Sequence, residues 1–169
     1  QRMAAGSGAV AQALEWVRGV GEALDFAHRR EVLHRDGKPA NVLLSSDGRA
    51  LLADFGIAKA GESSTRLTAT GMVLGTPAYM APEQIVGEPA DRRTDVYGLG
   101  ATLYEALSGR PLYQPSSAFA LVRLVLDSRF IPLGKLRPDL PPALVAIVER
   151  CLQGRRKDRY PTAQALARA

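Results

Sequence analysis

The chain has 169 residues, 46% of them hydrophobic, which is enough for one domain with a substantial core. Its formal charge of +5 comes from scattered lysines and arginines, so the sequence does not indicate a nucleic-acid-binding surface. The single cysteine excludes an internal disulfide, and the sequence shows neither a signal peptide nor an apolar run as long as a membrane span.

The first half of the chain predicts one long helix followed by short strands. Apolar residues at helical spacing begin at Val10 and predict a helix of about twenty residues. Extended segments are expected at 31–33, 42–44 and 49–53, with a turn at 45–48. Residues 54–83 show no sustained period, and so long a connection is usually functional or disordered.

The second half is expected to be helical. A helix starts at Asp95, because Val96, Leu99, Leu103 and Leu107 fall on one face, and Gly109 and Pro111 should end it. Further helices are expected at 117–127, at 143–152 and after the N-cap Thr162, with a proline-rich loop at 132–142. The predicted content is therefore mostly helix with a few short strands.

The chemistry is concentrated in the run from His34 to Asn41 and in the later triplet Asp54-Phe55-Gly56. Phosphoryl transfer needs a carboxylate to orient the nucleophile, a cation for the phosphoryl group and oxygen ligands for a metal ion. Asp36 and Lys38, followed by Asn41 and Asp54, offer these groups in this order. Taken alone, Asp36 is also compatible with a loop aspartate in an Asx-turn.

Together with Ala81-Pro82-Glu83, these motifs resemble the protein kinase family, and within it the bacterial-type (Hanks-like) serine/threonine kinases. The resemblance covers nearly the whole chain and implies a protein-kinase-like fold of the α+β family. Residues 1–169 would be its mostly α-helical C-terminal lobe. The sequence has no Gly-rich phosphate loop and no strand lysine for the phosphates, so we expect the N-terminal lobe to be absent and this chain alone to be an inactive fragment.

The resemblance implies transfer of the γ-phosphoryl group of ATP to serine or threonine hydroxyls of protein substrates, with Mg²⁺ or Mn²⁺ as the metal. Asp36 would accept or orient the hydroxyl proton, and Lys38 would contact the γ-phosphate. Asn41 and Asp54 would bind the metal ion and, through it, the phosphates of the nucleotide. Leu43 would lie under the adenine ring.

Residues 54–83 correspond to the activation segment of the family. Thr76 would hydrogen-bond near the catalytic residues. Thr70, ahead of Thr68, stands at the spacing of activating phosphothreonines, and Arg35 and Lys59 would receive the phosphate. A flexible threonine-rich loop is the alternative.

Five further residues are assigned structural roles by the resemblance. His34 and Phe55 would stack on each other, so His34 is not the expected general base. Asp95 would accept hydrogen bonds from the backbone of the catalytic loop, which is the run from His34 to Asn41, or alternatively cap its own helix. Glu83 and Arg159 would form a buried ion pair, although the turn before this arginine departs from the family pattern.

The sequence is also compatible with two other functions. One is a pseudokinase or docking module, and the other, less favoured, is a small-molecule phosphotransferase. We expect a cytoplasmic location, with any membrane anchor outside this segment. The resemblance is also compatible with a dimer in which one copy phosphorylates the other, and the missing N-terminal lobe would be the first partner of this chain.

Overall fold

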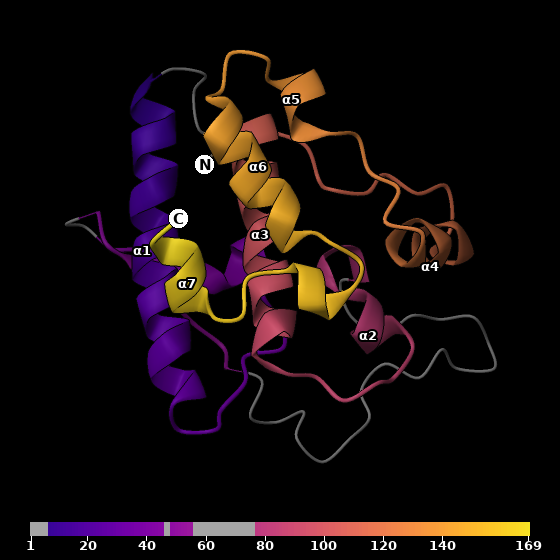
Figure 1. Ribbon diagram of the computed structural model, residues 1–169, viewed down its shortest axis with the longest axis horizontal. Coiled ribbons are helices and arrows are strands. Elements are labelled where there is room, and N and C mark those ends of the chain that lie inside the picture. The colour runs from indigo at the N-terminus through magenta and orange to yellow at the C-terminus, as the bar shows by residue number, and fades with distance from the viewer. Residues whose placement is uncertain (1–6, 46–47, 56–76) are drawn as a thin grey trace.

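The computed structural model describes residues 7–45, 48–55 and 77–169. This part of the chain is mostly helical, with one small hairpin (Figure 1). In chain order the elements are α1 (Ser7–His28), the 3₁₀ helix η1 (Pro39–Asn41), β1 (Val42–Leu44), β2 (Ala50–Leu52), η3 (Pro77–Tyr79), α2 (Pro82–Ile85), α3 (Arg92–Ser108), α4 (Ala118–Leu126), α5 (Leu133–Leu136), α6 (Pro142–Cys151), η4 (Arg156–Asp158) and α7 (Ala163–Ala167).

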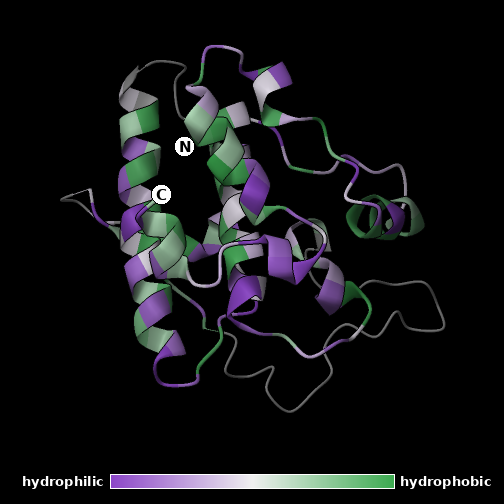
Figure 2. Cartoon of the chain, viewed as in Figure 1, coloured by the Kyte–Doolittle hydropathy of each residue, from purple (hydrophilic) through white to green (hydrophobic). Residues whose placement is uncertain are grey.

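Helix α1 confirms the predicted amphipathic helix and starts three residues before Val10. Figure 2 shows alternating hydrophobic and hydrophilic bands along it. Its stripe of Ala13, Val17, Val20 and Leu24 is buried, and it packs against α3 and α7. The polar residues between these positions keep the opposite face in water.

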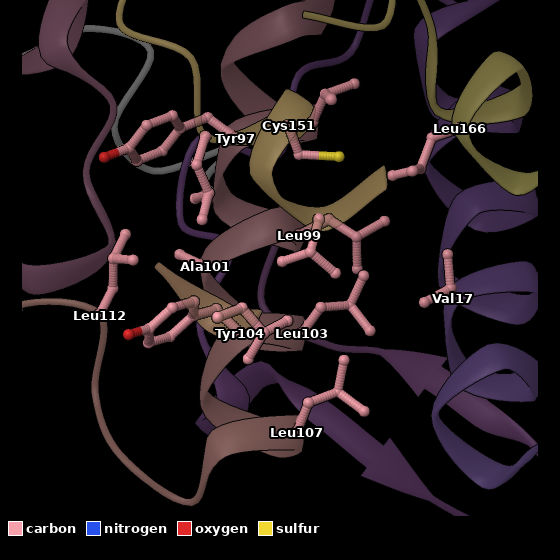
Figure 3. Packing of buried hydrophobic residues seen from close by; sticks show 14 of the residues in the cluster. Val17, Tyr97, Leu99, Ala101, Leu103, Tyr104, Leu107, Leu112, Cys151 and Leu166 are labelled. Carbon is pink, nitrogen blue, oxygen red and sulfur yellow. The ribbon is translucent and has the colours of Figure 1, made fainter. Parts of the chain in front are cut away.

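Helix α3 forms the centre of the core. The predicted face is buried, as are Tyr97 and Ala101, so this helix is enclosed on more than one side. Figure 3 shows Leu99, Leu103 and Leu107 of α3 beside Val17 of α1, with Cys151 of α6 and Leu166 of α7 close to them. The helix ends at Gly109, as predicted, where a φ of 69° suits glycine.

The predicted start of this central helix was wrong by three residues. Helix α3 begins at Arg92, and its N-cap is Asp91, whose side chain accepts a hydrogen bond from the Arg93 backbone N–H at 2.8 Å. Thr94 accepts from the Asp91 N–H at 3.2 Å, which completes a capping arrangement. Asp95 therefore lies inside the first turn, and its alternative role as the N-cap is excluded.

The short strands are partly as expected. The hairpin of β1 and β2 is antiparallel and pairs Val42 with Leu52 and Leu43 with Leu51, as the segments 42–44 and 49–53 predicted. The predicted strand at 31–33 does not form. A turn follows α1 instead, because Val32 N–H donates to the Ala27 carbonyl at 3.0 Å and Glu31 has a φ of 61°. The catalytic loop therefore follows a helix and a turn, and does not lie between two strands.

The C-terminal helices agree with the predictions in kind and nearly in bounds. Helix α4 starts after the N-cap Ser117, and α7 starts after Thr162, whose hydroxyl accepts from the Ala165 N–H at 3.0 Å. The loop predicted at 132–142 contains the short helix α5. Among the described residues, no helix has both the length and the hydropathy of a membrane span.

Candidate active site

Three of the predicted catalytic residues, Asp36, Lys38 and Asn41, lie close together between α1 and β1. Lys38 Nζ lies 2.8 Å from Asp36 Oδ2, and both side chains are partly buried. The Asn41 amide donates to the Asp36 backbone carbonyl at 2.8 Å and to Asp36 Oδ2 at 3.2 Å. A carboxylate, a cation and an amide are therefore held together, as phosphoryl transfer requires.

The hairpin brings Asp54 back to this loop. The Ala53 N–H donates to the Asn41 carbonyl at 2.8 Å, so the residue before Asp54 is hydrogen-bonded to Asn41. Asp54 itself is exposed and has a φ of 56°. Both hydrogen bonds of the Asn41 side chain use its nitrogen Nδ2. The side-chain oxygen of Asn41 and the Asp54 carboxylate are hard oxygen donors of the kind that suits Mg²⁺.

Asp95 anchors the backbone of the loop from helix α3. Its Oδ1 accepts from the Arg35 N–H at 2.7 Å, and its Oδ2 accepts from the His34 N–H at 2.9 Å. His28 Nε2 lies 2.7 Å from the same Oδ2, and both side chains are buried. The carboxylate is thus satisfied by neighbours on α1 and in the loop, as a buried charge must be.

His28 was not predicted. It lies at the end of the apolar stripe of α1 and carries no local signal for a contact with Asp95, 67 residues away. The contact between His28 and Asp95 forms because α1 packs against α3.

The ring of His34 is held on both sides by backbone groups. Its Nε2 lies 2.9 Å from the Ala53 carbonyl, and its Nδ1 accepts from the Asp36 N–H at 3.3 Å. A carbonyl only accepts, so Nε2 carries the proton. The Phe55 ring packs edge-on against it with centroids 4.9 Å apart. With both nitrogens engaged, this histidine is not placed to act as a base.

Glu83 and Arg159 form the expected ion pair between α2 and the C-terminal region. Two parallel hydrogen bonds join them, at 2.8 and 2.9 Å, and Thr94 donates a further one to Glu83 at 2.8 Å. Burial opposes the charge of this carboxylate most strongly. The hydrogen bonds and positive charge of Arg159, together with hydrogen bonds from the backbone and from Thr94, outweigh burial, so the pKa of Glu83 lies below its usual range.

Gly37 lies directly against helix α3. A Cβ added at Gly37 would be 3.1 Å from the Gly98 backbone, and a Cβ at Gly98 would be 3.1 Å from Gly37. Two glycines facing each other let the catalytic loop approach the helix closely. This contact keeps the loop near Asp95, on the same helix.

The hairpin presents an apolar pair beside the loop. Leu43 is 51% exposed and its cross-strand neighbour Leu51 is 50% exposed. Directly paired residues lie on the same face of a hairpin, so both side chains share one surface. Leu51 was not singled out from the sequence, because its place beside Leu43 depends on the strand register.

Gln84 of α2 is a third residue that the sequence did not single out, after His28 and Leu51. Its Nε2 donates to the Arg35 carbonyl at 2.9 Å, and its Oε1 accepts from the Ala81 N–H at 3.0 Å. Gln84 follows the Ala81-Pro82-Glu83 triplet and lies outside every motif. Only the placement of α2 beside the catalytic loop reveals the contact.

The regulatory predictions fall mainly outside the described residues. Thr68, Thr70 and Thr76 lie there, as does Lys59. Arg35 is described and is exposed next to Asp36.

Comparisons with known proteins identify the family of this chain. The sequence matches the protein kinase domain family over residues 4–169. It is 42% identical over 159 residues to the serine/threonine-protein kinase PknF of Mycobacterium tuberculosis, which covers 92% of this chain and 33% of that protein. It is 41% identical over 160 residues to the tyrosine-protein kinase MasK of Myxococcus xanthus, covering 92% and 25%. It is 37% identical over 153 residues to the serine/threonine-protein kinase PknB of Mycolicibacterium smegmatis, covering 90% and 24%.

The chain spans a third or less of the length of these curated relatives. The family match nevertheless covers almost all of its residues, and the observed fold is the predicted helical lobe with one short hairpin. The chain therefore belongs to the protein kinase family, of which it forms the mostly α-helical C-terminal lobe.

Proposed function

We propose that this chain carries the catalytic machinery of an ATP-dependent serine/threonine protein kinase. The observation that supports the proposal most directly is the convergence on Asp36 Oδ2, with Lys38 Nζ at 2.8 Å and Asn41 Nδ2 at 3.2 Å. Asp54 is brought to the same loop by the hydrogen bond between Ala53 and Asn41. These groups are the ones that phosphoryl transfer to a hydroxyl requires.

In this proposal Asp36 accepts a hydrogen bond from the substrate hydroxyl. The hydroxyl oxygen attacks the γ-phosphorus of ATP, a new oxygen–phosphorus bond forms, and the bond to the ADP oxygen breaks. The hydroxyl proton passes to the Asp36 carboxylate. The Lys38 ammonium, beside this carboxylate, offsets negative charge on the transferring phosphoryl oxygens.

Asn41 and Asp54 would hold the metal ion. Bound Mg²⁺ or Mn²⁺ would neutralise phosphate charge, and the chemistry of the oxygen donors fits either ion. Leu43, exposed on the hairpin, would lie under the adenine ring, with Leu51 extending the same apolar surface.

The choice of serine and threonine over tyrosine rests on Lys38. The chain has nearly the same sequence identity to a relative named as a serine/threonine kinase and to one named as a tyrosine kinase. Sequence identity alone therefore does not indicate which hydroxyl is phosphorylated. A lysine paired with the catalytic aspartate favours serine and threonine in this family. Thr76 would support that choice. Acid hydrolysis of a phosphorylated substrate, followed by separation of phosphoamino acids, tests it directly.

The proposal also includes regulation by phosphorylation, and two partners for this chain: a second copy of the protein and the N-terminal lobe. Phosphate on Thr70, or on Thr68, would be received by Arg35 and Lys59, and one copy of the protein would phosphorylate another in a dimer. Arg35 supports this role because it is exposed beside Asp36. The N-terminal lobe would complete the nucleotide site. The cytoplasm, where ATP is available, is the proposed location.

The central test is Asp36→Asn in the full-length protein. We expect phosphate transfer to a generic basic protein to fall by about 10² to 10⁴-fold, because the hydroxyl proton loses its acceptor. Asp139→Asn is the matched control, since Asp139 pairs with Arg137 at the surface and should leave the rate unchanged. Transfer to an aminoglycoside but not to protein would overturn the proposal, as would full activity of Asp36→Asn.

A further inference from the structure

Gln84 joins the end of residues 54–83 to the catalytic loop. Its side-chain oxygen accepts from the Ala81 N–H at 3.0 Å, within the first turn of α2. Its side-chain nitrogen donates to the Arg35 carbonyl at 2.9 Å, across a separation of 49 residues. The first bond caps a short helix, whereas the second has no role inside α2.

The residue that receives this second bond has a strained backbone. Arg35 has a φ of 62°, in the left-handed region that non-glycine residues rarely adopt. Such a conformation persists when the surrounding structure holds it in place. The Arg35 N–H is held by Asp95 Oδ1 at 2.7 Å, and the Arg35 carbonyl is held by Gln84. The groups on both sides of the strained Cα are therefore fixed, one by α3 and the other by α2.

The Arg35 carbonyl shares a planar peptide unit with the Asp36 N–H. A hydrogen bond that fixes this carbonyl therefore also fixes the direction in which the chain enters Asp36. On the other side of the same peptide plane, the Asp36 N–H donates to His34 Nδ1 at 3.3 Å. Gln84 and His34 together set the orientation of the unit that carries the catalytic carboxylate.

We infer that Gln84 is a positioning residue. Its hydrogen bond to the Arg35 carbonyl makes the position of Asp36 depend on the position of α2. The inference rests on the proposed kinase function. It predicts that the bond to Arg35, and not the cap of α2, controls the rate of phosphoryl transfer. The two bonds use different atoms of one amide, so they can be separated by substitution.

Two variants of the full-length protein separate them. Gln84→Glu keeps an oxygen for the Ala81 N–H but loses the donor to the Arg35 carbonyl. Gln84→Lys keeps a donor but loses the acceptor that caps α2. We expect Gln84→Glu to lower kcat by about tenfold or more, because small misplacement of a catalytic group is costly, and to leave the KM for ATP nearly unchanged.

Gln84→Lys should keep most of the kcat of the unsubstituted protein. Its unfolding temperature should be lower than that of Gln84→Glu. A purely structural role would instead lower kcat and unfolding temperature together. The matched control is Gln164→Glu, the same chemical change at an exposed position of α7, which should leave kcat unchanged.

The outcomes distinguish this inference from the proposed function. If the unsubstituted protein transfers no phosphate to protein, the proposed function fails. If it is active and Gln84→Glu keeps the full kcat, or if kcat in both variants follows their unfolding temperatures, the positioning role of Gln84 is overturned.

Discussion

At the scale of single residues, Glu83 and Arg159 show how a buried charge is kept in this fold. Their exposed fractions are 4% and 2%, so neither charge is satisfied by bulk water. Besides its bonds to Glu83, the Arg159 guanidinium donates to the carbonyls of Gln153, Gly154 and Arg93. A pair satisfied in this way is tolerated inside a protein, but removal of one partner leaves an uncompensated charge.

The pKa of Glu83 leads to a prediction about acid stability. Because its folded pKa is lowered, the carboxylate contributes stability above its unfolded pKa of about 4.3, and this contribution is lost as pH falls through the folded pKa. Glu83→Gln should destabilise the protein by about 3–5 kcal/mol at neutral pH. The difference should shrink on acidification, as urea unfolding of both proteins at several pH values will show.

Glu15→Gln provides the control for this experiment. Glu15 pairs with Arg18 on the surface, and its side chain is 65% exposed. Its substitution should change stability by about 1 kcal/mol or less. A penalty for Glu83→Gln that stays constant down to acidic pH would show that the charge of Glu83 does not stabilise the fold.

At the scale of elements, the packing of α3 against α6 depends on one residue without a side chain. A Cβ added at Gly100 would lie 2.4 Å from the Cβ of Cys151 on α6. Both atoms are attached directly to helical backbone, so a rotamer change cannot relieve the overlap. Gly100 therefore sets how closely the two helices approach.

Gly100→Ala should destabilise the protein, although alanine favours helix by about 1 kcal/mol relative to glycine. The overlap forces α3 and α6 apart, and overpacking of a core costs about 1–3 kcal/mol or more. Thermal unfolding measures the net effect. Gly8→Ala, where no atom lies within 4 Å of the added Cβ, should not lower stability. Equal behaviour of the two variants would disprove the close approach.

At the scale of the whole molecule, the helical core and the hairpin surface proposed to bind the nucleotide differ in burial. The core around α3 is enclosed by α1, α6 and α7. The hairpin, in contrast, presents the half-exposed Leu43 and Leu51 side by side, next to the exposed Asp54. An apolar pair beside a carboxylate suits a nucleotide that is covered from the other side.

This contrast predicts that residues 1–169 alone bind Mg·ATP at least about tenfold more weakly than the full-length protein, because adenine would be covered on one side only. Titration calorimetry on both proteins measures the difference, with circular dichroism to verify that the shorter chain is helical. Equal affinities would contradict the proposal that an N-terminal lobe completes the site. Binding by neither protein would favour a docking module.

The local elements were largely predictable from the sequence. The apolar period identified α1, turn residues identified the hairpin, and the N-cap Thr162 identified α7, because these signals act within a few residues. Helix α4 was also expected, at 117–127. The strand expected at 31–33 failed because the chain after α1 forms a turn with a positive φ at Glu31. The start of α3 was misplaced because the apolar period begins only after the capping sequence of Asp91 and Thr94.

The sequence by itself determined which chemistry is proposed for this protein, since Asp36, Lys38, Asn41 and Asp54 stand in motifs whose residue types and order are typical of phosphoryl transfer. The tertiary structure alone decided what holds those groups in place: His28 against Asp95, Gly37 against Gly98 and Gln84 against the Arg35 carbonyl. The physical reason is distance along the chain. Motifs and periods are local, whereas these contacts arise only when helices far apart in sequence pack into one core.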